Sequence, residues 1–320
     1  MSAFSSSTYT SQDYAKYRPT YPESFFHYIL ENAKVTSLQS LTILDVGCGP
    51  GTCFITLIPE LVNLLNNDNN PLKEVKLIAS DLSQTMLNEA EREITPLLSN
   101  TKAIEVQYVQ AKGEDVSEHI TKDSVDLVIA AECMHWVDAE QFLNGIRQIM
   151  RTGGTLAYWG YVDPVFTAVG NNEDSALLKK LNDVYEDFVY VGDGRLGVYW
   201  EQPGRERLRR LYENINEVVE SDGEHWNDIV KCIRDPLQGK VQTVGNADQG
   251  ALKMEMTLPF ESFLKYADTW SSSFKWNESH PEEQRVSKVF YKKINQVAQI
   301  DLADEITIEM KTVYMIAHYK

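Results

Sequence analysis

The sequence predicts an α/β fold in which helices cover both faces of a mostly parallel sheet. Apolar runs alternate with helical patterns over residues 41–161, and a glycine-rich turn joins the first run to the first helical pattern. The run SVDLVIAA at 124–131 is apolar on both faces, as is typical of a central parallel strand. We therefore expect strands near residues 41–46, 75–80, 104–109, 124–131 and 154–160.

The rest of the chain predicts three segments around this α/β core of residues 41–161. Residues 1–40 are expected to form an N-terminal cap segment and a first helix. Residues 162–250 alternate helical patterns with loops and carry no clear strand, which predicts a mainly helical insertion over the carboxyl edge of the sheet, where such sheets bind ligands. Residues 251–320 return to the core, with strands near 253–258 and 305–319 and helices near 259–272 and 282–299.

The composition excludes several classes of partner. The chain of 320 residues has a formal net charge of −17, so nucleic acid, which requires clustered Lys and Arg, is not expected. No apolar stretch approaches the roughly 18 residues of a membrane span, and the first residues lack the features of a secretory signal. The four cysteines form no C-x-x-C pair and no zinc-type cluster, which predicts no metal and a cytoplasmic location. The oligomeric state stays open, and a monomer is compatible with the sequence.

The turn ILDVGCGPGT at residues 43–52 predicts the cofactor. Its glycines are spaced G-x-G-x-G, whereas a dinucleotide turn reads G-x-G-x-x-G and uses its amides to hold a pyrophosphate. Pro50 removes one amide donor from the turn, which disfavours a nicotinamide-dependent oxidoreductase. A cofactor without phosphates fits better, and S-adenosylmethionine (SAM) is the one that we predict.

The cofactor residues are expected at the carboxyl ends of the first four strands. Asp45 is placed to hold the cofactor's ammonium group directly or through water, and Asp81 to accept hydrogen bonds from both ribose hydroxyls. Residues 113–115 are placed to border the adenine, or they form a solvated acidic loop. The predicted cofactor-binding residues are Asp45, Gly47, Cys48, Gly49, Gly51, Asp81, Leu82, Met86, Gly113, Glu114, Asp115 and Glu132.

Three segments carry the residues expected near the methyl acceptor. The fourth strand leads into His135 and Trp136, which are expected beside the transferred methyl group, and His135 acts either as a base or as a neutral wall residue. The segments YAKYRPTYP at 14–22 and YWEQPGRERLRR at 199–210 combine aromatic and arginine side chains. The predicted substrate-binding residues are Tyr14, Tyr17, Arg18, Trp159, Tyr161, Arg195, Tyr199, Trp200 and Arg205.

These motifs together resemble the fungal trans-aconitate methyltransferases, which belong to the class I SAM-dependent methyltransferases. The resemblance rests on the glycine turn, the HW pair at 135–136, WGYVDP at 159–164, YWEQPGR at 199–205 and DTWSS at 268–272. It covers nearly the whole chain, and the departures are the Asn-rich loop at 66–71 and a longer region around 214–250. The resemblance implies a Rossmann-like sheet of seven strands, with the helical insertion covering the substrate.

The resemblance also implies that the enzyme forms a methyl ester on a small carboxylic acid, such as trans-aconitate or a related polycarboxylate. A carboxylic acid with a pKa near ~4 is already ionised at neutral pH, so this reaction requires no general base. Arg18 and Arg205, with Arg195 behind them, are the expected clamps for the other carboxylates. The alternatives are another small-molecule acceptor, such as a hydroxyl with His135 as base, and a SAM-binding protein without catalysis.

Overall fold

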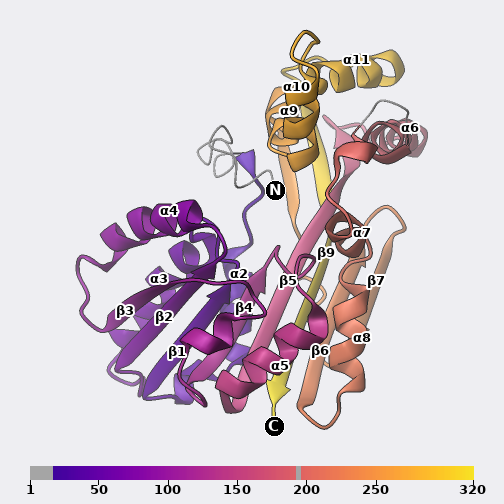
Figure 1. Cartoon of the computed structure of the whole chain (residues 1–320). Coiled ribbons are helices and arrows are strands. Elements are labelled where there is room, and N and C mark those ends of the chain that lie inside the picture. The colour runs from indigo at the N-terminus through magenta and orange to yellow at the C-terminus, as the bar shows by residue number, and fades with distance from the viewer. Residues whose placement is uncertain (1–16, 192–195) are drawn as a thin grey trace.

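The computed structural model describes residues 17–191 and 196–320, which form one nine-stranded sheet with helices on both faces (Figure 1). The strand order along the sheet is β3-β2-β1-β4-β5-β9-β6-β7, and β8 pairs with β9. The strands are β1 (Ser40–Val46), β2 (Glu74–Asp81), β3 (Ile104–Gln110), β4 (Val125–Ala131), β5 (Met150–Val169), β6 (Trp226–Asp235), β7 (Lys240–Val244), β8 (Glu255–Pro259) and β9 (Glu305–Tyr319). The longer helices are α2 (Glu23–Asn32), α3 (Thr52–Leu65), α4 (Gln84–Ile94), α5 (Ala139–Ile149), α6 (Ser175–Glu186), α7 (Gly204–Arg209), α8 (Glu213–Ser221), α9 (Phe260–Asp268), α10 (Ser271–Ser279) and α11 (Val286–Ala298).

Strands β1 to β5 form the parallel half of the sheet, and they confirm the predicted α/β fold. β1 lies between β2 and β4, with Asp45 opposite Ala79 on one side and Ile129 on the other. Because the strands run in the same direction, their carboxyl ends and the loops that follow meet at one edge. The glycine turn, Asp81 and the segment after β4 all lie at this edge.

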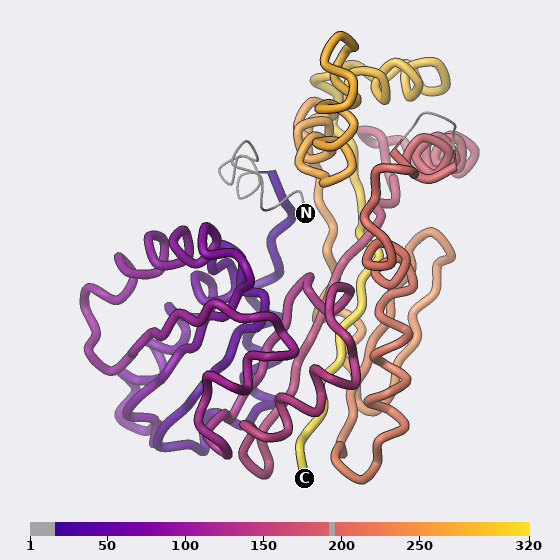
Figure 2. Tube along the Cα trace, in the orientation of Figure 1, coloured from indigo at the N-terminus to yellow at the C-terminus, as the bar shows by residue number. Residues whose placement is uncertain are grey.

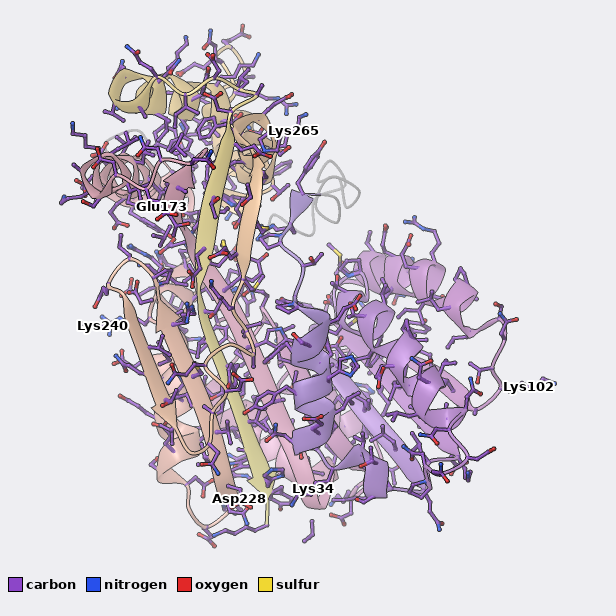
Figure 3. All side chains as sticks on the ribbon, turned by 180° about the vertical axis from the view of Figure 1, so that it is seen from behind. Lys34, Lys102, Glu173, Asp228, Lys240 and Lys265 are labelled. Carbon is purple, nitrogen blue, oxygen red and sulfur yellow. The ribbon has the colours of Figure 1, made fainter. Side chains whose placement is uncertain are left out.

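The other half of the sheet is antiparallel, and here two expectations were wrong. The sheet has nine strands rather than seven, and residues 162–250, which were expected to carry no clear strand, contain strands β6 and β7 beside helices α6 to α8. β7 is an edge strand with mostly exposed side chains, and β6 buries only Trp226 and Cys232 fully. Strands with so little buried surface leave no apolar run, which is why the sequence pattern missed them. Figure 3, seen from behind, labels Lys240 on this outer hairpin.

Strands β5 and β9 are the longest, with 20 and 15 residues, and they pair antiparallel from Thr155–His318 to Val169–Ile306. They rise beyond the parallel strands and carry helices α6, α9, α10 and α11, which we call the cap helices (Figures 1 and 2). The predicted strand at 154–160 therefore continues much further than expected. This extension places the cap helices beyond the carboxyl edge of the sheet.

Two buried clusters fill the two faces of the sheet, because successive residues of a strand point to opposite sides. Trp159 packs among the residues of α2, edge-on to Phe25 and Phe26, while Tyr158 packs on the other face with Tyr212. None of the helices in the described parts of the chain is long and apolar enough to cross a membrane.

Candidate active site

The turn between β1 and α3 depends on three glycines with positive φ, which are Gly47 at 67°, Gly49 at 54° and Gly51 at 87°. A Cβ atom on Gly47 would lie 2.7 Å from Cβ of Cys133, and one on Gly51 would lie 2.9 Å from Cδ1 of Ile94. A Cβ atom on Gly49 would have no described heavy atom within 4 Å. Gly47 and Gly51 therefore allow close packing of the turn, whereas Gly49 faces open space that a ligand can occupy.

Asp81, at the end of β2, lies beside this turn. Its Oδ2 accepts a hydrogen bond from the Gly49 N–H at 3.0 Å, and its Oδ1 accepts one from the Ser83 N–H at 2.8 Å. Burial raises the pKa of Asp81, although these backbone hydrogen bonds oppose the rise. Each carboxylate oxygen still has a lone pair for a further donor, which suits the predicted contact with two ribose hydroxyls.

Leu82 and Met86 follow Asp81 in the sequence, and α3 follows the glycine turn. Leu82 is 63% exposed, which leaves its side chain available to a flat ring such as adenine, whereas Met86 is largely buried against the core. Helix α3 begins after Gly51 with no side-chain cap, so the N–H groups of its first turn remain open to a ligand. The Cys48 N–H donates to the carbonyl of Ser80 at 2.9 Å, which ties the turn to β2.

Asp45 differs from its predicted role in one respect. Its side chain has no exposed surface, so direct contact between its carboxylate and a cofactor requires movement of the groups around it. Neither oxygen has a well-formed hydrogen bond within residues 17–191 and 196–320, although the Cys53 thiol lies nearby. Burial and the charge of Asp81 raise the pKa of Asp45 well above its usual range. An unsatisfied buried carboxyl next to the turn is the kind of group that a cationic ligand or an enclosed water would stabilise.

The loop at residues 113–115 follows β3 and was predicted to border the adenine. Glu114 accepts a hydrogen bond from the Asp138 N–H at 2.8 Å through Oε1, which leaves its Oε2 for a ligand. Gly113 is closely packed, because a Cβ atom there would lie 2.9 Å from Cγ1 of Val137. Asp115 is exposed. The contact of this loop with adenine stays a prediction.

The segment after β4 turns sharply at Glu132, which has a positive φ of 54° that is uncommon for a residue other than glycine. The Glu132 N–H donates to the carbonyl of Trp159 at 3.0 Å, and the carboxylate of Glu132 accepts from the Tyr161 N–H. Burial raises the pKa of Glu132 to about 7, against this hydrogen bond and the positive charges of Arg18 and Arg205.

His135 lies three residues further on and is 7% exposed. Its ring stacks on Tyr212 at a centroid distance of 6.1 Å, and its Nδ1 lies 3.5 Å from the Tyr212 hydroxyl. Burial, together with the charges of Arg205, Arg18 and Arg207, lowers the pKa of His135 to about 3. The imidazole is therefore neutral at pH 7 and is a weak base.

Trp136 connects this segment to α7. Its ring packs on Gly204, where a Cβ atom would lie 2.6 Å from the indole, and 43% of the residue remains exposed. The carbonyl of the next residue, Val137, accepts a hydrogen bond from Nη1 of Arg207 at 3.1 Å. These contacts bring the start of α7, and with it Arg205, to the end of β4.

Arg205 is held by a carboxylate that the sequence analysis did not single out. Asp163 occupies a β-bulge of β5, with φ at 43°, and its Oδ1 accepts from Nη2 of Arg205 at 2.8 Å. Asp163 also accepts from the Tyr185 hydroxyl at 3.1 Å and from Nε of Arg209 at 3.3 Å. Burial opposes ionisation of Asp163, but the positive charge of Arg205 and the other donors hold its pKa below the usual value. An acidic residue inside an apolar strand pattern was the signal that could have found it.

The guanidinium of Arg205 also stacks on an aromatic side chain. Its Cζ lies 3.9 Å from the centre of the Trp200 ring, whose Nε1 donates to the carbonyl of Val189 at 3.1 Å. Nε of Arg205 is buried and has no hydrogen-bond partner within the described residues. Arg205 is thus fixed in position with one donor still to be satisfied.

Arg18 reaches the same region from the opposite end of the sequence. Its Nε donates to Oγ1 of Thr269 and its Nη2 to the carbonyl of Thr269, both at 3.1 Å. The next residue, Trp270, packs against Trp200 at a centroid distance of 6.3 Å. The DTWSS segment therefore links Arg18 to the side chains around Arg205, which is a role that the sequence analysis did not assign to Thr269.

The remaining predicted acceptor residues have different surroundings. Trp159 is fully buried, so the predicted contact of its side chain with the acceptor would require movement of the core, and it stays a prediction. Tyr161 is 4% exposed, and Tyr199 lies half-buried beside His280. The centre of the Tyr17 ring lies 5.9 Å from Nζ of Lys265. Tyr14 and Arg195 lie outside the described residues. No group of three potential metal ligands occurs in residues 17–191 and 196–320.

Comparisons with known proteins find methyltransferases similar to this chain. Residues 43–154 match the family model described as a methyltransferase domain. The chain is 27% identical to the probable S-adenosylmethionine-dependent methyltransferase CRG1 of Saccharomyces cerevisiae, over 96% of this chain and 94% of that protein. It is 26% identical to the malonyl-[acyl-carrier protein] O-methyltransferase of a Paenibacillus species, over 55% of this chain and 52% of that protein. The structure of a putative type II methyltransferase from Anaeromyxobacter dehalogenans has the same fold, with a TM-score of 0.56 and 19% identity over 93% of this chain and 97% of that one.

Proposed function

Since this chain is a SAM-dependent methyltransferase, we propose that it transfers the methyl group to a carboxylate of a small polycarboxylic acid, such as trans-aconitate, and forms a methyl ester. The observation that carries this proposal is the convergence of Arg18 and Arg205 on the end of β4. The two arginines come from different parts of the chain, and the charges of both act on Glu132 and on His135. Guanidinium groups bind carboxylates, and Nε of Arg205 has no hydrogen-bond partner among the described residues, so a second carboxylate of the acceptor has a donor here.

The residues at the carboxyl edge fit the methyl donor. The Asp81 carboxylate would hold the ribose hydroxyls, Leu82 would cover the adenine, and the open space at Gly49 with the first turn of α3 would accommodate the amino-acid end. SAM supplies an electrophilic methyl group on a sulfonium sulfur. The relative named for O-methylation of malonyl-[acyl-carrier protein] supports an oxygen atom as the acceptor.

The mechanism requires positioning rather than proton removal. The acceptor's carboxyl group is ionised at neutral pH, since free carboxylic acids have pKa values near ~4. Arg18 and Arg205 would fix the other carboxylates so that one oxygen points in line with the methyl carbon and the sulfur. His135, neutral and stacked on Tyr212, would donate one hydrogen bond from its ring N–H that orients this oxygen.

The second candidate is methylation of a hydroxyl group with His135 as general base. A general base works best when its pKa lies near the working pH, and burial beside three arginines lowers the pKa of His135 to about 3. This histidine is a weak acceptor for a hydroxyl proton, so the carboxylate reading is preferred. A SAM-binding protein without catalysis is the third reading, and turnover of any acceptor would exclude it. We also propose a cytoplasmic location, because the four cysteines are all free.

A methyl-transfer assay over a panel of small molecules tests the proposal. The panel should contain mono-, di- and tricarboxylic acids, including trans-aconitate, and hydroxyl acceptors of similar size, with mass detection of each product. We expect methyl esters of the di- or tricarboxylic acids and little product from the monocarboxylic acids, since these lack a second group for the arginines. Methylation confined to hydroxyl compounds would reject the carboxylate assignment in favour of the second candidate.

A further inference from the structure

Glu132 places a carboxylate at a site that is proposed to bind a carboxylic acid, and two ionised carboxylates at one site repel each other. The positive charges of Arg18 and Arg205 act on its carboxylate, and these are the two arginines that would bind the acceptor's carboxylates. The positive φ of 54° and the hydrogen bond from the Tyr161 N–H hold the side chain in this position. A residue kept in a strained conformation at a ligand site commonly serves function rather than stability.

We propose that Glu132 determines the specificity of the acceptor site by taking up a proton when an anionic acceptor binds between Arg18 and Arg205. In the free enzyme the ionised carboxylate of Glu132 partly balances the two arginines. A bound polycarboxylate balances the charges of the arginines instead. Glu132, once protonated, does not repel this anion and can donate a hydrogen bond to it from its O–H. This inference rests on the proposed function, since it requires an anionic acceptor.

The surroundings of Glu132 support this exchange. Among the described residues, the groups that act on it from neighbouring elements are Arg18 before α2, Arg205 on α7, Tyr266 on α9, Tyr212 before α8 and its chain neighbour Cys133. The pKa values of the tyrosines and the thiol are raised, so these groups stay neutral, and the two arginines are the charges that favour ionised Glu132. Because its pKa is about 7, a small change in its surroundings is enough to change the protonation of this carboxyl at neutral pH.

The direction of the shift follows from elementary electrostatics. A nearby negative charge disfavours an ionised carboxyl, and the arginines favour it less once their charges are engaged by another anion. Acceptor binding therefore raises the pKa of Glu132 above about 7, and the enzyme binds a fraction of a proton in the neutral range. Between the pKa of the free enzyme and the higher pKa of the complex, acceptor affinity falls by up to about tenfold for each pH unit, because up to one proton is taken up with each acceptor.

Calorimetry in buffers of different ionisation enthalpy measures this proton directly. The enzyme is first saturated with S-adenosylhomocysteine and then titrated with trans-aconitate between pH 6 and pH 9. We expect net proton uptake that increases from pH 6 into the mildly alkaline range, and Glu132→Gln should abolish it. The amide oxygen of glutamine can still accept the Tyr161 hydrogen bond, so this variant should fold and bind the acid with a much weaker dependence on pH.

The control is Glu173→Gln, because Glu173, labelled in Figure 3, is exposed and lies in the segment before α6. This variant should keep the proton uptake of the parent enzyme. Acceptor binding without proton uptake, or an uptake that persists in Glu132→Gln, would overturn the role of Glu132 and leave the carboxylate assignment standing. If no acid of the panel binds or is methylated while a hydroxyl compound is, the proposed function itself fails, which is a distinguishable result.

Discussion

Asp163 and Arg205 form a buried ion pair in which the carboxylate comes from a bulge of β5 and the guanidinium from the first turn of α7. Their side chains are 5% and 13% exposed, and Nη2 lies 2.8 Å from Oδ1. The pair fastens α7 to the sheet at the point where the acceptor is proposed to bind. It also orients Arg205, whose Nε has no hydrogen-bond partner among the described residues.

Replacing Asp163 with Asn should destabilise the protein, because it leaves the charge of Arg205 buried beside neutral groups. Removing one partner of a buried ion pair costs about 3–5 kcal/mol. Chemical denaturation should show this loss, and the double variant Asp163→Asn with Arg205→Met should lose less than the single one. Asp183→Asn is the matched control, since its pair with Lys179 is largely exposed and is worth about 0–1 kcal/mol. Equal losses in Asp163→Asn and Asp183→Asn would contradict the structural role of the buried pair.

Replacing Arg205 with Lys should weaken the acceptor while sparing the methyl donor. Lysine keeps the charge near Asp163 but loses the planar fork that matches a carboxylate. Losing hydrogen bonds to a charged group costs about 1.5–3 kcal/mol, so KM for the acid should rise roughly tenfold to a hundredfold. Arg210→Lys serves as the control, because Arg210 lies just beyond the end of α7, is exposed and pairs with Glu206. Steady-state kinetics with a matching rise in KM for SAM would show that Arg205 serves the whole site instead.

The two glycines of the turn should respond differently to replacement by alanine. Gly47→Ala places a methyl group 2.7 Å from Cys133 in a left-handed conformation, so a loss of stability should dominate. Gly49→Ala meets no described atom and should cost only the roughly 1–2 kcal/mol of the positive φ, while its methyl group projects into the space proposed for the donor. Thermal unfolding and SAM titration of both variants measure the two effects. A Gly49→Ala enzyme with parental affinity for SAM would move the donor away from this turn.

Replacing His135 with Gln tests whether a base is required. We expect kcat to fall less than tenfold, since a hydrogen-bonding wall residue is replaced by another, whereas removal of a general base typically costs 10²–10⁴-fold. The substitution should also remove part of the acid sensitivity of folding. His135 has a folded pKa of about 3, below its unfolded value, so the unfolded chain binds more protons between about pH 3 and 6.5 and stability falls as pH falls through that range. Denaturation at pH 7 and pH 5 would show a smaller difference for the variant than for the parent.

The sequence predicted the parts of the fold and site that depend on local pattern. The strands of the parallel half are apolar runs, and the turn at Gly47 and the acidic residue at Asp81 lie at fixed places after such runs. Asp81 lies beside Gly49 as expected, because β1 and β2 are neighbours in register.

The parts that the sequence did not predict depend on contacts between distant segments. The pairing of Asp163 with Arg205 requires a bulge in β5, and the contact of Arg18 with Thr269 joins residues 251 positions apart. Trp159 was expected at the site because it ends a strand pattern, but the strand continues and the residue packs against α2. The alternation of side chains along β5 places Trp159 on the face that α2 covers.

The most direct test of the central claim is a crystal structure of the enzyme with S-adenosylhomocysteine and trans-aconitate bound. The account predicts ribose hydroxyls on Asp81, two acceptor carboxylates on the guanidinium groups of Arg18 and Arg205, and the remaining carboxylate directed at the sulfur beside His135. An acid bound away from both arginines, or with none of its carboxylates facing the sulfur, would contradict it.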